Sequence, residues 1–295
     1  MEHGLFEPGT LRTALQERMR HALACRALLP IETEEETIED AGVRFAVRRV
    51  SSLARKAAQA SSASACTPKS GAGGNAFPVE PDLVVAEISD THIALLNKYP
   101  VISEHLLLLT RRYVPQEALL DQADFTALAA CMREYDALGF YNGGVAAGAS
   151  QAHKHLQLVP LPLASDQTVP MAALFDALAR GPGAARVSGL PFRHAFSWND
   201  AQALVSGDGL LTTYLELLAA AGINGVAHDG ALQQSAPYNL LVTRAWMLLV
   251  LRSRERFDGI SINALGFAGS IFVKNASELA RVRQIGPMAM LAAVA

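Results

Sequence analysis

The chain has 295 residues, of which 51% are hydrophobic and 18% charged, and its formal net charge is −3. This composition is typical of a globular protein with ample apolar material for a core. The charge balance provides no basic field of the kind that drives nucleic-acid binding, and 6% aromatic residues argue against a base-stacking surface. We therefore expect no nucleic-acid partner.

Cysteine usage and the apolar runs indicate the compartment. Cys25, Cys66 and Cys131 are widely spaced and form no C-x-x-C pair, which favours a reduced, cytoplasmic protein and argues against a structural zinc built from cysteine pairs. The N-terminus lacks the basic and apolar regions of a signal peptide. Arg244 and Glu216 interrupt the apolar runs before they reach the ~20 residues that a membrane span needs, so we expect no membrane partner.

The N-terminal part begins with a helix over residues 11–29, whose apolar side chains recur every three or four positions. The acidic run 31–40 is interpreted as a solvated surface segment. Residues 43–50 alternate like a strand. Residues 56–81 are small, polar and rich in Gly and Pro, which predicts a flexible loop of the kind that often covers an enzyme site.

The next block predicts an antiparallel meander, because short apolar runs are separated by turn residues at 83–88, 93–97 and 104–110. Asn97 and Lys98 close the second run just before a proline. Lys98 is either a phosphate contact or an exposed lysine at a strand end, and the local sequence does not decide between them.

The remaining elements follow from the same periodicities. They are a helix over 115–138 closed by Gly139, a short helix over 171–180, a strand over 192–198, a helix over 210–221, a hairpin over 237–254 that turns near Arg244 and Ala245, and a closing helix over 277–291. No internal repeat is present.

A glycine-rich segment followed by an alternating segment is the most informative part of the chain. Residues 141–151 are small and glycine-rich, which suits a loop whose backbone N–H groups meet phosphate oxygens. Residues 153–160 alternate. Because residues two apart in a strand share a face, a strand here places His153, His155 and Gln157 in one row, with the intervening leucines toward a core.

Three interpretations fit this row. As zinc ligands, the two histidines make a good pair, but Gln157 is a poor third ligand. As a purely structural row, three buried polar side chains would each need a partner. As a catalytic row, a neutral imidazole attacks phosphorus in line while an acceptor holds its other nitrogen. We favour catalysis because Gln157 can donate to a phosphate oxygen but cannot supply a proton, which suits a good leaving group such as a nucleoside polyphosphate.

Four segments, in order, resemble a known family. They are L-N-K-Y-P-V before E-H-L-L-L-L-T, then N-G-G-V-A-A-G-A-S-Q-A-H-K-H-L-Q, P-Y-N-L-L-V-T-R-A-W-M and I-N-A-L-G-F-A-G. H-K-H-L-Q is similar to the H-x-H-x-Q motif of the transferase branch of the histidine-triad superfamily. The wider chain resembles the diadenosine tetraphosphate phosphorylases of that branch, also called ATP adenylyltransferases.

The resemblance implies a role for each site residue. His155 would be the nucleophile that takes AMP as an adenylyl-histidine, and the backbone carbonyl of His153 would hold its other nitrogen. Gln157 would bind the transferred phosphate. The nucleotide-binding residues would be Asn97, Lys98, Asn142, Gly148, Ala149, Ser150 and Gln151, together with Lys56 or Lys69 from the loop.

The implied reaction is phosphorolysis, in which inorganic phosphate attacks the intermediate and diadenosine tetraphosphate is converted to ATP and ADP. Relatives also accept donors such as adenosine phosphosulfate. The nucleophile itself needs no metal cofactor and no metal ligands are assigned, although Mg²⁺ commonly accompanies a polyphosphate. Two alternatives stay open: a hydrolase of the same superfamily, which usually has a third histidine where Gln157 stands, and a non-catalytic dinucleotide-binding sensor, which has no need of His155.

The implied fold is α+β, a histidine-triad-like antiparallel sheet with packed helices, in agreement with the meander. We expect a single nucleotidyltransferase domain over 1–295, with a catalytic core of about 42–182 and a C-terminal segment of about 190–295. One departure from the family pattern is N-A-F at Asn75 where N-P-F is expected. It concerns the loop and leaves the histidine row unchanged.

Overall fold

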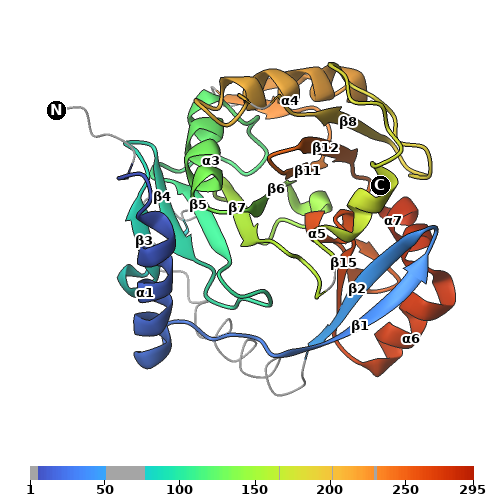
Figure 1. Cartoon of the computed structure of the whole chain (residues 1–295), viewed down its shortest axis with the longest axis horizontal. Coiled ribbons are helices and arrows are strands. Elements are labelled where there is room, and N and C mark those ends of the chain that lie inside the picture. Colours follow the sequence, from blue (N-terminus) through green and yellow to red (C-terminus); the bar gives the residue numbers. More distant parts are fainter. Residues whose placement is uncertain (1–5, 51–76, 166, 201, 229–230) are drawn as a thin grey trace.

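The computed structural model describes residues 6–50, 77–165, 167–200, 202–228 and 231–295. Positions 56–76 of the expected loop lie outside these residues, and so do Lys56 and Lys69. Figure 1 shows a large sheet with helices packed on it, which confirms the predicted α+β fold. No helix in the described ranges is long and apolar enough to cross a membrane.

The main sheet has eight strands in the order β3-β4-β5-β7-β6-β11-β12-β8, and all neighbouring strands are antiparallel. They are β3 (Val84–Glu87), β4 (His92–Leu96), β5 (Leu106–Thr110), β6 (Ala137–Gly143), β7 (His155–Pro160), β8 (His194–Trp198), β11 (Tyr238–Val242) and β12 (Trp246–Leu251). The predicted meander and hairpin are both confirmed. Strands from the expected catalytic core and C-terminal segment share this sheet, and the division into those two segments stays a prediction.

A second sheet has three strands, β1 (Thr33–Asp40), β2 (Val43–Val50) and β15 (Ser270–Val273), and β15 runs parallel to β2. The predicted strand over 43–50 is confirmed. The acidic run does lie at the surface, as predicted, but the prediction missed that it forms strand β1. Its carboxylates pair with arginines from β2 and elsewhere, as in Glu35–Arg48 at 2.6 Å, so a strongly charged strand can lie at this sheet edge.

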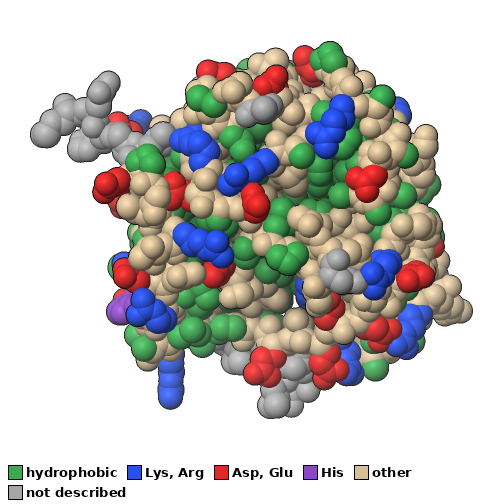
Figure 2. All heavy atoms as spheres, in the orientation of Figure 1, with side chains coloured by type: hydrophobic (Ala, Val, Ile, Leu, Met, Phe, Trp, Pro, Cys, Tyr) green, Lys and Arg blue, Asp and Glu red, His purple; other side chains and the backbone are tan. Residues whose placement is uncertain are grey.

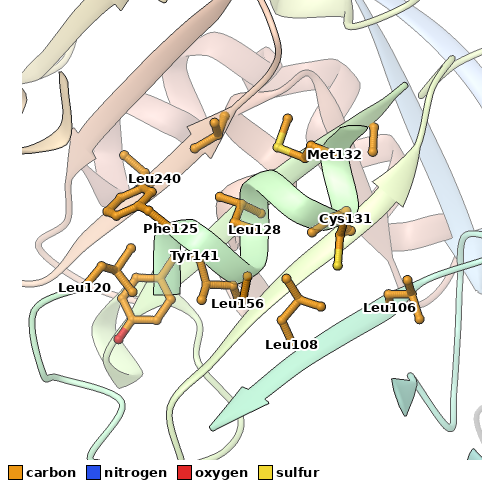
Figure 3. Packing of buried hydrophobic residues seen from close by; sticks show 14 of the residues in the cluster. Leu106, Leu108, Leu120, Phe125, Leu128, Cys131, Met132, Tyr141, Leu156 and Leu240 are labelled. Atoms are coloured by element: carbon orange, nitrogen blue, oxygen red, sulfur yellow. The ribbon is translucent and has the colours of Figure 1, made fainter. Parts of the chain in front are cut away.

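Helices cover one face of the main sheet: α1 (Leu11–Ala24), α3 (Gln122–Glu134) and α4 (Asp208–Ala221). In Figure 3, Phe125 and Leu128 of α3 pack over Leu156 of β7, with Leu108 of β5 beside them. The other face packs on the three-stranded sheet, α5 (Ala264–Phe267), α6 (Ala276–Ile285) and α7 (Pro287–Val294). Val159 of β7 belongs to this second core, so the two parities of β7 face opposite sides of the sheet.

Helix α3 is shorter than the helix predicted over 115–138. It begins at Gln122 because Asp121 caps it: the Asp121 carboxylate accepts from the backbone N–H groups at 123 and 124. After Glu134 the chain continues into β6, so Gly139 lies within a strand and does not close the helix. A Cβ at Gly139 would lie 2.9 Å from Leu128 Cδ1, so glycine allows α3 to pack closely on the strand.

Other helix boundaries also differ from the prediction. Helix α1 ends at Ala24 because Arg26 adopts a left-handed φ of 61°. The single closing helix is wrong: Gly286, with φ of 88°, and the following proline divide it into α6 and α7. The helix expected over 171–180 is only a 3₁₀ turn, η3 (Pro170–Leu174).

The smaller elements complete the fold. They are the 3₁₀ turns η1 (Pro81–Leu83) and η2 (Val145–Ala147), the strand pair β9 (Gly225–His228) and β10 (Ala231–Gln234), and the pair β13 (Arg256–Phe257) and β14 (Ile260–Ser261). On the face drawn in Figure 2, acidic and basic side chains are interspersed and do not gather into one patch.

Candidate active site

A cavity of about 340 Å³ opens between the main sheet and the three-stranded sheet. This volume lies within the range of small-ligand sites. Adjacent strands supply polar side chains to its lining: Asn97 follows β4, His105 precedes β5, Asn142 is on β6 and Gln157 is on β7. The rest of the lining is formed by Val50, Val101, Gly148, Ser150, Ser261, Asn263, Leu265, Phe272, Val273, Lys274 and Glu278.

His155 lies on β7 two residues before Gln157, and therefore on the same strand face. Its Nδ1 lies 2.8 Å from the carbonyl oxygen of His153, which can only accept, so Nδ1 carries the proton and Nε2 keeps a lone pair. Burial lowers the pKa of His155, and the hydrogen bond to that carbonyl opposes the shift only in part. The ring is thus a neutral imidazole with a free nucleophilic nitrogen.

The ring of His153 is fully engaged. Its Nδ1 accepts from the backbone N–H of Phe77 at 3.0 Å, and its Nε2 donates to the carbonyl oxygen of Arg112 at 3.0 Å with Thr110 Oγ1 at 2.9 Å. Burial lowers its pKa, which favours the neutral ring. Neither nitrogen is left for a metal ion or a phosphate, and the part of His153 that reaches His155 is its backbone carbonyl.

Two of the side-chain amides in the lining, Gln157 and Asn142, are held by protein partners through their oxygens. Gln157 Oε1 lies 2.9 Å from His105 Nε2, and Asn142 Oδ1 accepts from Asn239 Nδ2 at 2.8 Å and from the N–H of Ala264 at 2.9 Å. His105 and Asn239 were not among the residues that the sequence singled out. The register of β5 on β7, which places Leu107 opposite Gln157, brings His105 to the site.

The glycine-rich segment turns against the residues that precede α5. Gly148 has φ of 90°, and a Cβ there would lie 2.9 Å from Asn263 Cβ, so only glycine fits. The N–H groups of Gly148 and Ala149 bond within the turn, to the carbonyls of Val145 and Gly144. Ala149 and Gln151 do not line the cavity, whereas Ser150 does.

Lys98 and Lys274 differ in position. Lys98 Nζ pairs with the Glu80 carboxylate at 2.8 and 2.9 Å and does not line the cavity. Lys274, which directly follows β15, does line it and was not among the residues predicted from the sequence. The cavity therefore has a cation from the far end of the chain.

Two family models cover most of the chain. Residues 1–177 match the Ap4A phosphorylase N-terminal domain, where Ap4A is diadenosine tetraphosphate, and residues 188–295 match the ATP adenylyltransferase C-terminal domain. The chain belongs to the Ap4A phosphorylase family. The family resemblance that the motifs predict is thereby confirmed.

Relatives of this Ap4A phosphorylase family member include two proteins of Saccharomyces cerevisiae. It is 30% identical to Protein APA1 over 215 residues, which are 64% of each chain. It is 28% identical to diadenosine 5',5'''-P1,P4-tetraphosphate phosphorylase 2 over 211 residues, which are 63% of each. The matched region thus spans slightly less than two thirds of either relative.

Solved structures of yeast Ap4A phosphorylase Apa2 share the fold. The complex with Ap4A matches with a TM-score of 0.77 and 21% identity, covering 99% of this chain and 97% of that one. The complex with AMP matches with a TM-score of 0.76 and 22% identity, covering 97% and 95%. At this identity the match establishes the architecture of the family member, and its chemistry has to be argued from its own residues.

Metal-ligating side chains gather elsewhere. Within the described ranges, the group of three with converging ligand atoms is His21, Cys25 and Asp82, exposed on α1 and η1. His21 and Asp82 already pair at 2.8 Å. None of the three lines the cavity of this family member.

Proposed function

We propose that the protein is a diadenosine tetraphosphate phosphorylase that transfers AMP through His155 to inorganic phosphate, giving ATP and ADP. The observation that carries the proposal is the hydrogen bond from His155 Nδ1 to the His153 carbonyl, which leaves Nε2 as a neutral nucleophile. The family, and the name of the second yeast relative, support the substrate.

The first step forms a bond between His155 Nε2 and the phosphorus next to one adenosine. The P–O bond opposite the nucleophile breaks, and its electron pair leaves on ATP. Gln157 cannot act as a general acid, but ATP is a good leaving group at neutral pH and needs no proton from the enzyme. Amide donors and Lys274 at the cavity are suited to stabilise the charge that develops on the phosphoryl oxygens.

In the second step a phosphate oxygen attacks the adenylyl group, the N–P bond breaks, and ADP leaves with the neutral imidazole restored. The nucleophile requires no metal in this scheme, and Mg²⁺ would travel with the polyphosphate. Transfer from adenosine phosphosulfate would use the same intermediate. A cytoplasmic location fits nucleotide substrates and remains part of the proposal.

The test is to incubate the purified protein with diadenosine tetraphosphate, with and without inorganic phosphate, and to measure the nucleotides released. Formation of ATP and ADP that depends on phosphate is the expected result. Cleavage that is independent of phosphate would show that the protein is a hydrolase and would overturn the proposal. Tight binding without any cleavage would indicate a sensor.

A further inference from the structure

Gln157 and Asn142 both line the cavity, and a side-chain amide can present either its oxygen or its NH₂ group to a ligand. The two ends differ in function, because only NH₂ can donate to a phosphate oxygen. Which end faces the cavity is decided by the hydrogen bonds that the amide makes with the protein. For Gln157 and Asn142 these bonds can be followed back to a group that can only donate.

The first chain of hydrogen bonds begins at the backbone N–H of Tyr99, which donates to Asn97 Oδ1 at 3.2 Å. Asn97 Nδ2 therefore faces His105 Nδ1 at 3.1 Å, and this ring nitrogen must accept. Burial lowers the pKa of His105 to about 4, so the ring is neutral and its proton lies on Nε2. That N–H donates to Gln157 Oε1 at 2.9 Å, which leaves the NH₂ of Gln157 for the cavity.

The second chain begins at Arg252, a side chain with no acceptor atoms. Its Nη1 donates to Asn239 Oδ1, so Asn239 Nδ2 is the donor to Asn142 Oδ1 at 2.8 Å and to the carbonyl of Ala147 at 2.8 Å. The backbone N–H of Ala264 reaches the same oxygen of Asn142 at 2.9 Å. The NH₂ of Asn142 is thus the end left over.

The NH₂ groups of Gln157 and Asn142 have no acceptor among the residues that the structure describes, although both side chains are at least 90% buried. Donors that face a cavity without partners point to a ligand with several acceptor oxygens. Because their orientation is fixed before the ligand arrives, they cost no reorganisation during the reaction.

We propose that His105 and Asn239 are positioning residues, which fix the Gln157 and Asn142 amides so that both NH₂ groups face the ligand in the cavity. The identity of the ligand as the transferred phosphate rests on the proposed function. The hydrogen-bond orientation does not, and it can be tested separately.

The kinetic test compares variants at position 105 in the wild-type protein and in the Gln157→Ala variant. Gln157→Ala is expected to lower kcat by about 10²-fold, the usual cost of losing one such donor. His105→Leu is expected to lower kcat about tenfold or more with a smaller change in KM, because the Gln157 amide can then rotate. His105→Gln keeps an N–H near the position of Nε2 and should recover most of the rate.

The decisive measurement is non-additivity. In the Gln157→Ala background, His105→Leu should cause little further loss, since His105 acts through Gln157. Equal losses in both backgrounds would assign His105 a general structural role and overturn the proposal. Asn239→Asp is expected to behave in the same way in an Asn142→Ala background. The matched control is His194→Leu, which alters a buried strand histidine on β8 outside the cavity. Its effect on kcat should be the same in the wild-type and Gln157→Ala backgrounds.

A second measurement requires no turnover. In the ¹⁵N spectrum of histidine-labelled protein, with the His105→Gln variant used for assignment, His105 should be the neutral Nε2–H tautomer at pH 7. An Nδ1–H tautomer would overturn the proposal whatever the enzyme activity. A wild-type protein that shows the expected tautomer but does not react with diadenosine tetraphosphate would overturn the proposed function alone.

Discussion

Lys154 and Asp124 form a buried ion pair behind the histidine row, on the opposite face of β7. Lys154 Nζ contacts Asp124 Oδ2, and both side chains are at most 2% exposed. Asp124 also pairs with His92 at 3.0 Å. Burial alone would raise the pKa of Asp124, but His92 and Lys154 together hold it below its usual value. Since Lys154 stands between His153 and His155, the pair ties the backbone next to His155 to the start of α3.

Removing the cation should therefore be costly. Lys154→Met is expected to lower the free energy of unfolding by about 3–5 kcal/mol, because it leaves the Asp124 carboxylate buried and less compensated. Urea unfolding measures the change. The control is Arg281→Met, which breaks the exposed pair with Asp258 and should cost about 1 kcal/mol or less. A Lys154 variant as stable as this control would contradict the assigned importance of the buried pair.

The nucleophile can be tested by trapping. His155→Ala is expected to abolish the labelled AMP–protein adduct that forms when the wild-type protein is incubated with labelled diadenosine tetraphosphate without phosphate. The reason is that no other described histidine combines a free ring nitrogen with a place beside Gln157. Circular dichroism would verify that the variant remains folded. Persistence of the adduct would show that another residue is the nucleophile.

Stability should fall in acid between pH 6.5 and about pH 4. Burial lowers the pKa values of His153, His155 and His194, and lowers that of His105 to about 4. Unfolded histidines titrate near 6.5, so below this pH the unfolded chain binds more protons than the folded one. The contribution of these groups is fully present above pH 6.5 and is lost progressively as the pH falls. His105 alone accounts for roughly 3 kcal/mol, at ~1.4 kcal/mol per pKa unit.

Urea unfolding at pH 7.5, 5.5 and 4.5 measures this dependence, and His105→Gln should flatten it. For the same reason the activity should persist further into acid than the usual pKa of 6.5 would allow, because burial lowers the pKa of His155. A stability that does not change over this interval would mean that the buried histidines are protonated in the folded state.

Gly148→Ala should weaken nucleotide binding more than a positive φ alone can explain. The new methyl group would meet Asn263 at 2.9 Å and the Ile262 carbonyl at 3.1 Å, and would displace the segment that lines the cavity. Gly183→Ala is the matched control, because its φ of 89° is nearly the same but a Cβ there meets nothing within 4 Å. Calorimetric titration with AMP should show at least a tenfold loss for Gly148→Ala and little change for the control.

Lys98 and Lys274 should differ in their effect on substrate binding. Lys274→Ala is expected to raise KM roughly tenfold, the loss of about one charge-assisted hydrogen bond. Lys98→Ala should change KM less than threefold, because Lys98 pairs with Glu80 outside the cavity. Steady-state kinetics over a range of diadenosine tetraphosphate concentrations would distinguish them. The reverse order would restore Lys98 as the phosphate contact.

Elements with a clear period-two or helical pattern could be predicted from the sequence. The alternation in β7 correctly assigned Leu156 and Gln157 to opposite faces, because the apolar and polar positions are separated there. Strand β1 was missed because all its inward positions except Ile38 are charged or polar, and its partners in β2 are needed to see the alternation. The start of α3 was misplaced because Asp121, and not Pro115, ends the extended segment before it.

The site was predictable only where it is local in sequence. The hydrogen bond between His155 and the His153 carbonyl follows from a two-residue spacing on one strand. His105 and Lys274 reach the cavity, and Asn239 reaches Asn142, through strand pairings between distant parts of the chain, which a single sequence does not reveal.

The parallel pairing of β15 with β2 joins nearly opposite ends of the chain. During synthesis, the histidine row leaves the ribosome while β15 has not yet been made. Until then one wall of the cavity, with Lys274, is missing, and β2 has no partner on that edge. A nascent or truncated chain would thus carry the nucleophile without a closed site for its substrate. Such a chain is expected to be unreactive toward nucleotides and to depend on its last residues for completion.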